Sequence, residues 1–238
     1  MSPTQGPGAA GDSLERIASD VVGCERCPRL RKYCREVART RRAAFRDQVY
    51  WGLPVPGFGD PAAWLLIVGL APAAHGGNRT GRVFTGDGSG DWLYGELFRQ
   101  GIASQPESVS RDDGMELRGA YVTAALRCAP PQNRPRPDEA ERCREYLVRE
   151  MRALRRVRVR LVLGRIGFDA FLKARRTLGV SRMDVKPAFG HGVFYAMPEG
   201  GWLLCSYHPS RQNTSTGVLT RGMWREVFDT AVRLRDRV

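Results

Sequence analysis

Residues 69–90, GLAPAAHGGNRTGRVFTGDGSG, form a glycine-rich stretch that directly follows the apolar segment WLLIVGL. The stretch holds one histidine, one phenylalanine and one aspartate, in a chain with only three histidines. It matches neither the P-loop pattern GxxxxGK[ST] nor the dinucleotide-binding pattern GxGxxG. We therefore expect a binding loop for a ligand that is not held through either of these motifs.

Two side chains of this loop have the chemistry of a catalytic site. Phe84 lies among small and polar residues, where its ring could stack on a flat ligand such as a nucleobase. Asp87 lies between Gly86 and Gly88, with no lysine nearby to neutralise its charge. Each residue also has a structural interpretation, because a loop phenylalanine can anchor itself in the core and an aspartate can cap a helix.

A second loop, HPSRQNTSTG at residues 208–217, follows the apolar segment GWLLCSY. Pro209 restricts the backbone after His208, so we expect the imidazole to project at the edge of a sheet. The next residues offer hydrogen-bond donors of the kind that contact phosphates and the grooves of nucleic acids, namely Ser210, Arg211, Gln212 and Asn213.

The cysteine spacing indicates a metal site. Cys24 and Cys27 are separated by two intervening residues, whereas Cys128 and Cys143 flank a proline-rich segment that could return a second pair to the same point. Zinc and an iron-sulfur cluster both remain open from the spacing alone, and Cys34 is a possible substitute ligand. Cys205, inside an apolar segment, is expected in the core.

The charge of the chain favours a polyanionic partner. Its net charge is +13, and all but three of its 38 basic residues are arginine. Guanidinium groups suit phosphate because they donate two coplanar hydrogen bonds, so nucleic acid is the leading partner. The alternative is that the arginines reflect codon bias and solubility.

Alternating apolar and amphipathic segments predict an α/β fold. We expect a three-layer α/β/α sandwich with a central, mainly parallel four-stranded sheet. The predicted strands are 63–70, 120–126, 159–164 and 202–208, with an extra β segment within 188–197. A helix that starts near Asp12 leads to Cys24, and further helices are predicted at 91–101, 137–156, 166–179 and 220–237. Ligands of such sheets bind at the carboxyl ends of the strands, where the two loops and the RCAPP turn should converge.

The remaining expectations concern organisation and location. Residues 1–11 are rich in Gly, Pro and Ala and are expected to form a disordered lead rather than a signal peptide, with a single domain over 12–238. No apolar run approaches the roughly 20 residues that span a bilayer. We expect a cytoplasmic protein without membrane contact.

The two loops and the cysteine quartet together resemble the uracil-DNA glycosylase superfamily, specifically its iron-sulfur family 5 branch. The resemblance runs from about residue 20 to the C-terminus, and GLAPAAHGGNRTGR and HPS correspond to the active-site motifs of the family. It implies a base-excision enzyme that flips uracil out of double-stranded DNA and hydrolyses its N-glycosidic bond. The enzyme is expected to act as a monomer.

The resemblance also implies a role for each candidate residue. Asp87 activates water or stabilises the sugar cation, and His208 donates a hydrogen bond to the departing base. Phe84 stacks on the base, and Arg82 joins the second loop in binding DNA. The implied 4Fe-4S cluster is held by Cys24, Cys27, Cys128 and Cys143 and acts as a structural staple rather than in electron transfer. It would hold the arginine-rich loops CPRLRKYCREVARTRR and NRPRP as a fixed surface for the DNA backbone. The other implied base-binding residues are Gly69, Leu70, Ala71, His75 and Asn78.

Two features refine the implied activity. Related glycosylases commonly place an asparagine near the segment YVTAALRC, where this chain has Ala124 and Ala125, so we expect a broader range that includes hypoxanthine and damaged pyrimidines. None of the three lysines lies in the motifs, so no Schiff base is expected and the product should be an intact strand with an abasic site.

Two other classes of function remain as alternatives. A metal-stapled nucleic-acid binder without catalysis would explain the arginines and cysteines, but not Phe84, Asp87 and His208. The other alternative is a small-molecule α/β enzyme, but the sequence contains no recognisable cofactor motif.

Overall fold

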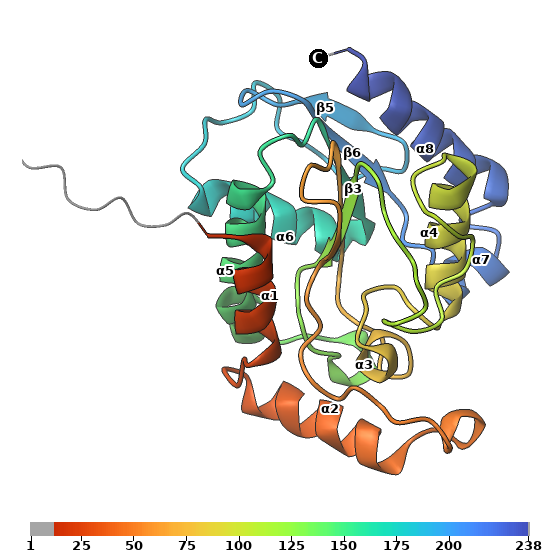
Figure 1. Cartoon of the computed structure of the whole chain (residues 1–238). Coiled ribbons are helices and arrows are strands. Elements are labelled where there is room, and N and C mark those ends of the chain that lie inside the picture. Colours follow the sequence, from red (N-terminus) through yellow and green to blue (C-terminus); the bar gives the residue numbers. More distant parts are fainter. Residues whose placement is uncertain (1–11, 238) are drawn as a thin grey trace, which may run out of the picture.

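The computed structural model describes residues 12–237 and is built around one mixed sheet (Figure 1). The strand order is β1-β3-β2-β4-β6-β5, and the four middle strands are parallel. These middle strands confirm the predicted ones: β2 (Leu65–Gly69), β3 (Ala120–Ala124), β4 (Val159–Leu163) and β6 (Trp202–Ser206). The sheet differs from the four-stranded prediction at its two edges. There, β5 (Phe194–Ala196) falls within the expected extra segment, and the antiparallel β1 (Phe58–Gly59) is too short to show a sequence pattern.

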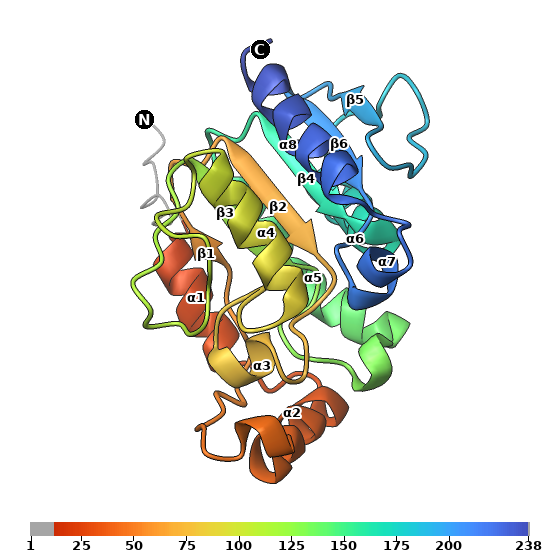
Figure 2. The ribbon, with the colours of Figure 1, turned by 90° about the vertical axis from the view of Figure 1, so that its right-hand side faces the viewer.

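The two faces of the sheet are covered by different helices, which confirms the three-layer architecture. On one face lie α4 (Gly88–Arg99) and α8 (Arg221–Arg235), whose apolar side chains pack against Ile67 and Leu161 (Figure 2). On the other face lie α1 (Leu14–Val22), α5 (Pro137–Ala153) and α6 (Gly164–Thr177), which pack against Val68 and Val162. Since both faces are covered, β2 and β3 are buried at every residue rather than at alternate ones.

The register of the middle strands brings their carboxyl ends to one edge. Gly69 is paired with Ala124, Val68 with Val162, and Leu163 with Ser206. The glycine-rich loop leaves β2 at this edge, and the His208 loop leaves β6 beside it. The predicted convergence of the two loops is therefore confirmed by the strand pairing.

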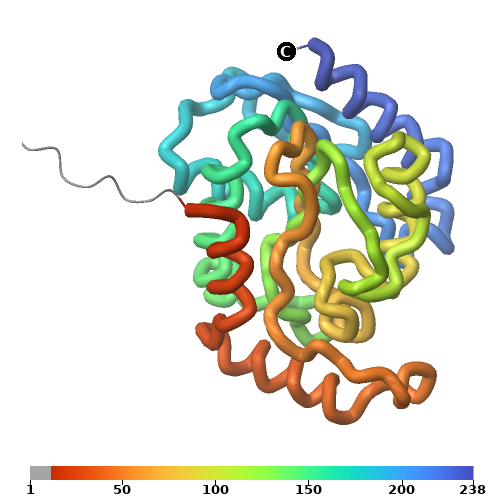
Figure 3. Tube along the Cα trace, in the orientation of Figure 1, coloured from red at the N-terminus to blue at the C-terminus, as the bar shows by residue number. Residues whose placement is uncertain are grey.

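The segment CPRLRKYCREVARTRR, expected as a basic loop, instead contains helix α2 (Pro28–Thr40). Pro28 occupies the first turn, where its missing N–H costs nothing, and Leu30, Cys34 and Val37 form a buried stripe at helical spacing. This helix lies outside the three layers, beyond the carboxyl edge of the sheet and next to α3 (Gly77–Thr80) (Figure 3). Three further short helices lie in connecting segments of the chain: η1 (Ala43–Phe45), η2 (Pro131–Asn133) and α7 (Arg211–Ser215).

Ser13 and Asp12 make contacts at the start of the described chain, and Cys205 lies in its core. Ser13, not Asp12, caps α1, because its Oγ accepts a hydrogen bond from Arg16 N at 3.2 Å. Asp12 instead forms an ion pair with Arg149 at 2.6 Å. Cys205 is fully buried in β6, as predicted. The predicted lead 1–11 lies outside the described residues, and no helix within 12–237 is long and apolar enough to cross a membrane.

Candidate active site

The rings of Phe84 and His208 lie against each other at the carboxyl edge of the sheet. Their centroids are 5.7 Å apart and their planes differ by 26°. The ring of Phe84 also lies directly on Gly69, where a Cβ atom would come within 2.6 Å of Cζ. Gly69 therefore has to lack a side chain for the ring to reach the end of β2. The two predicted loops thus contact each other at this edge.

Phe84 packs in the core and also contacts the second loop. It is 9% exposed and packs with the core, which matches the structural interpretation, yet its ring faces the imidazole of His208. Its backbone adopts φ of +52°, a left-handed conformation that non-glycine residues rarely adopt. Such backbone strain is concentrated at functional sites, where the surrounding structure must hold it in place.

Asp87 caps helix α4 and also presents a carboxylate oxygen to the glycine-rich loop. Its Oδ1 accepts hydrogen bonds from the backbone N–H groups of Ser89 at 3.0 Å and Gly90 at 3.1 Å. Its Oδ2 faces Gly76, where a Cβ atom would approach to 2.0 Å. Burial raises the pKa of this carboxyl, while the two backbone N–H groups partly oppose the shift. The structural and the catalytic interpretation therefore use different oxygens of the same side chain.

His208 is held as a neutral imidazole. Burial lowers its pKa from the ordinary value of 6.5 to about 4, since a charged ring would lose its hydration here. Asn213 fixes the backbone of the residue by donating from Nδ2 to the His208 carbonyl oxygen at 2.9 Å. A neutral imidazole in this position can donate one hydrogen bond without carrying a charge.

The residues after His208 divide into inward and outward groups. Ser210 caps α7 by accepting a hydrogen bond from Asn213 N at 3.3 Å, so both residues shape the loop. Arg211 and Gln212 point outward, and both residues are exposed. These two side chains remain available for a phosphate backbone.

Two predicted ligand-contacting residues have structural roles in the fold. Arg82, expected to bind DNA, is 4% exposed, and its guanidinium bonds to Asp113 at 2.7 Å, Ser108 and the Arg111 carbonyl oxygen. Asn78, expected to bind the base, is 1% exposed and donates from Nδ2 to the carbonyl oxygens of Cys34 and Ala74, each at 3.3 Å. Because both side chains are buried in these hydrogen-bond networks, they stabilise the loop from the inside of the protein.

The other predicted base-binding residues lie along the start of the loop. Leu70 and Ala71 are half-buried and pack on the cysteine-containing cluster of Cys27, Cys34 and Cys128. His75 is also half-buried, and its Nδ1 lies 3.1 Å from the hydroxyl of Tyr50. Burial and two neighbouring arginines lower the pKa of His75.

Arg79 and His191 hold the site in ways that the sequence did not reveal. Arg79 donates to the carbonyl oxygens of His75 at 2.8 Å and Gly86 at 2.7 Å, and so joins the start of the loop to the residue before Asp87. His191 accepts a hydrogen bond from Tyr207 N at 3.2 Å, directly before His208. A buried arginine inside a polar loop resembles a surface arginine in sequence, so only the contacts distinguish it.

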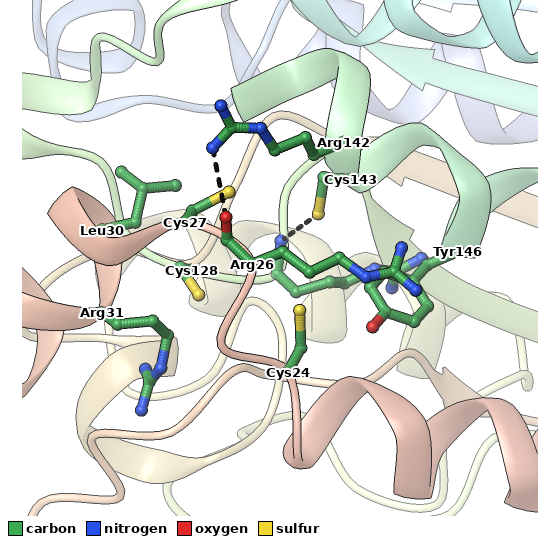
Figure 4. Close-up of a pocket in the computed structure, with 10 residues that line it drawn as sticks. Cys24, Arg26, Cys27, Leu30, Arg31, Cys128, Arg142, Cys143 and Tyr146 are labelled. Carbon is green, nitrogen blue, oxygen red and sulfur yellow. Dashed lines mark hydrogen bonds between the residues drawn. The ribbon is translucent and has the colours of Figure 1, made fainter. Parts of the chain in front are cut away.

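The predicted cysteine quartet lines a single pocket beside α2 (Figure 4). We call it the cysteine pocket, and its lining residues are Cys24, Arg26, Cys27, Leu30, Arg31, Arg127, Cys128, Arg142, Cys143 and Tyr146. Cys34 does not line the pocket, but its buried thiol interacts with Cys128 and donates to the Ala129 carbonyl oxygen at 3.6 Å. The quartet predicted from spacing is therefore brought together, with Cys34 behind it.

Burial favours the neutral form of two thiols of the cysteine pocket. Burial raises the pKa of Cys27, and it raises that of Cys143 to about 12. A metal ligand must be a thiolate, so metal binding here would release protons. Within residues 12–237, no three His, Cys, Asp or Glu side chains converge closely enough to hold a single metal ion.

A buried ion pair connects the cysteine pocket to the sheet. Arg127 donates to Glu150 at 2.6 Å, and Glu150 also accepts from the Thr123 hydroxyl at 2.7 Å in β3. Both charged residues are at most 1% exposed. Since removing one partner of a buried ion pair leaves an uncompensated charge, this network fixes the chain between β3 and Cys128.

Comparison with known proteins identifies similar sequences over most of the chain. The model of the uracil DNA glycosylase superfamily matches residues 56–231. A protein of Thermus thermophilus named type-5 uracil-DNA glycosylase is 50% identical over 92% of this chain and 97% of its own length. Proteins with the same name in Mycobacterium tuberculosis and Pyrobaculum aerophilum are 48% and 46% identical, over 95% and 89% of this chain and 83% and 88% of their own lengths.

Proposed function

Because this chain belongs to the uracil-DNA glycosylase superfamily, we propose that it removes uracil from DNA by hydrolysing the N-glycosidic bond, which leaves an abasic site. The observation that carries the proposal is that the stacked pair of Phe84 and His208 lies at the end of β2, while Asp87 presents Oδ2 to Gly76 in the loop that starts there. The type-5 relatives of Thermus thermophilus and Mycobacterium tuberculosis are 50% and 48% identical to this chain over 92% and 95% of its length.

The proposed chemistry assigns opposite charges to the two sides of the broken bond. As the bond stretches, the sugar becomes cationic and the leaving base becomes anionic. Asp87 serves the sugar side, where its carboxylate orients the attacking water or stabilises the cation. His208 serves the base side, where its neutral N–H donates to the oxygen that gains negative charge. Phe84 provides an aromatic surface in the wall that receives the flipped base.

The proposed substrate is double-stranded DNA. Arg211 and Gln212 are exposed next to His208, and the net charge of +13 attracts phosphates. The chain has only three lysines, and none lies in either active-site loop, so we propose a monofunctional enzyme without a Schiff-base intermediate. We also propose a monomer, since one chain supplies Asp87, Phe84 and His208.

We propose that the cysteine pocket holds a 4Fe-4S cluster. The donor set fits, because four thiols line one pocket whose walls contain neither carboxylate nor imidazole. Cys24, Cys27, Cys128 and Cys143 would hold the cluster, which supplies iron-thiolate bonds as a cross-link. Leu70 and Ala71 pack against the apolar cluster that contains Cys27 and Cys128, so the cross-link would support the start of the glycine-rich loop.

The base specificity of the enzyme is expected to extend beyond uracil. Ala124 at the end of β3 pairs with Gly69, and Ala125 follows it, so neither position offers an amide to read the base edge. We expect release of hypoxanthine and damaged pyrimidines as well as uracil from a panel of duplexes, detected as alkali-induced strand breaks.

Borohydride added during the reaction should trap no protein-DNA adduct. A uracil-only profile would contradict the broad range, an adduct would contradict the monofunctional chemistry, and tight binding without breaks would favour the non-catalytic binder.

Metal analysis of the purified protein tests the proposed cluster. We expect about four iron and four sulfide per chain, with broad absorption near roughly 400 nm, as for a 4Fe-4S cluster held by four cysteines. Cys128→Ser should lose most of the iron, whereas Cys205→Ser, at a buried cysteine outside the pocket, should retain it. One zinc per chain without sulfide would contradict the proposal.

A further inference from the structure

Four buried side-chain polar atoms within residues 12–237 lack a hydrogen-bond partner, and two of them belong to arginines of the cysteine pocket. These are Nη2 of Arg31 and Nε of Arg127. A buried donor without an acceptor loses its hydration and gains nothing in exchange, so it is rare in folded proteins. Both donors belong to residues that line the same pocket, so a group that accepts hydrogen bonds in this pocket could satisfy them.

The four arginines that line the cysteine pocket differ in where their charges are neutralised. Arg26 and Arg142 are half exposed, and their guanidinium groups form ion pairs with the exposed carboxylates of Glu145 and Asp138. Arg31 and Arg127 have side chains that are 2% and 1% exposed. The pocket therefore has an outer pair of solvated arginines and an inner pair of buried ones.

Arg31 is the less completely paired member of the inner pair. Its Nη1 donates to the Gly52 carbonyl oxygen at 3.0 Å, and its only ion-pair contact among the described residues is a long one of 3.4 Å to the exposed Glu25. Its positive charge acts on the neighbouring thiols of Cys34 and Cys128. The guanidinium thus lies within electrostatic reach of a predicted ligand.

Arg127 approaches the cysteine pocket from the other side. Its backbone N–H donates to Sγ of Cys143 at 3.3 Å, and its guanidinium uses Nη1 and Nη2 for Thr123 and Glu150. Only Nε is left without a partner. Glu150 neutralises this arginine, so its contribution to the pocket is a directed donor more than a net charge.

We propose that Arg31 and Arg127 donate hydrogen bonds from Nη2 and Nε to the sulfur atoms of the group in the cysteine pocket and thereby favour the more negative state of that group. The inference rests on the proposed iron-sulfur cluster, whose sulfides and thiolates are acceptors and whose total charge is negative. Hydrogen bonds to cluster sulfurs and nearby positive charge stabilise the reduced form, and both raise its potential.

Arg31 is the better residue to test, because replacing Arg127 would leave Glu150 as an unpaired buried charge. Arg31→Met removes the donor and the charge while it keeps an unbranched apolar stem. Arg31→Lys keeps the charge. Arg35→Met is the matched control, since Arg35 lies one turn further along α2, pairs with the same Glu25 and does not line the pocket.

The experiment measures the cluster itself in the full-length protein. Iron and sulfide are counted first, and then the ratio of reduced to oxidised cluster is measured at a fixed potential near the wild-type midpoint. In Arg31→Met we expect this ratio to fall about tenfold, which is about 59 mV for a one-electron couple. Arg31→Lys and Arg35→Met should stay within about twofold of the wild type.

A second readout does not require reduction of the cluster. Hydrogen bonds to cluster sulfurs make the Fe–S stretching bands of the resonance Raman spectrum sensitive to replacement of H₂O by D₂O during expression. We expect Arg31→Met to reduce this isotope shift and Arg35→Met to leave it unchanged. A cluster that is fully present in Arg31→Met with the wild-type ratio and isotope shift would overturn the role of Arg31. A wild-type protein without sulfide would instead overturn the cluster.

Discussion

Asp87→Asn is expected to lower the single-turnover rate of uracil excision by at least about 100-fold, the lower range for a positioned acid-base group. The substitution removes the charge of Oδ2, which faces Gly76, but an asparagine oxygen can still accept the hydrogen bonds from Ser89 and Gly90. Asparagine and aspartate are similarly good helix caps. The free energy of unfolding should therefore stay within about 0.5 kcal/mol of the wild type.

Asp91→Asn is the matched control for this variant. Asp91 lies one turn further along α4 but is exposed, so its replacement should change the excision rate less than about twofold. A rapid-quench measurement with enzyme in excess separates the chemical step from product release. A near-normal rate in Asp87→Asn would show that the carboxylate only caps the helix.

The raised pKa of Asp87 gives this prediction a pH dependence. Burial raises the pKa above the ordinary 3.8, so the reactive carboxylate becomes protonated, and the rate falls, at a higher pH than for a solvated aspartate. His208, with a pKa of about 4, stays neutral through most of that range. The acid limb of the rate profile should therefore be absent from the residual activity of Asp87→Asn.

His208→Ala is expected to lower the same rate by about 100-fold to 1,000-fold, or about 2.7 to 4 kcal/mol of transition-state stabilisation, as for the loss of one donor to a developing anion. The pKa of about 4 means that the imidazole is neutral at pH 7 and keeps one N–H for the base. Since the negative charge on the base appears only as the bond breaks, duplex binding should weaken much less than the rate.

His208→Phe distinguishes the donor from the ring. The imidazole also stacks on Phe84 at 5.7 Å, so alanine removes packing together with the hydrogen bond. A phenylalanine would keep an aromatic surface without an N–H, and it should be as slow as alanine. Recovery of the rate in His208→Phe would mean that packing, not hydrogen bonding, is the contribution of His208.

The sequence allowed the sheet and the meeting of the two loops to be predicted because both depend on short-range patterns. Apolar runs such as LLIVG identify strands that are buried on both faces, and parallel strands necessarily end at one edge. The spacing of Cys24 and Cys27 similarly indicated half of the cysteine pocket. Such features can be recognised from the local sequence, without knowledge of any long-range contact.

The errors concern residues whose role depends on a distant partner. Arg82 resembles a DNA-binding arginine until its buried partner Asp113, 31 residues away, is known. Asn78 donates from Nδ2 to the Cys34 carbonyl oxygen, 44 residues away, on a helix that was taken for a loop. Helices in arginine-rich segments are hard to recognise from sequence because the mean hydropathy of such segments is low. This holds for α2, although three of its apolar residues form a buried stripe.

The most direct test of the proposed site is the amount of free uracil released in a single turnover from a duplex with one uracil, by wild-type protein and by Asp87→Asn with equal duplex binding. The wild type should release one uracil per duplex and leave an intact strand with an abasic site, while Asp87→Asn releases it at least about 100-fold more slowly. Equal rates for the two proteins, or duplex binding by the wild type without release of uracil, would contradict the account.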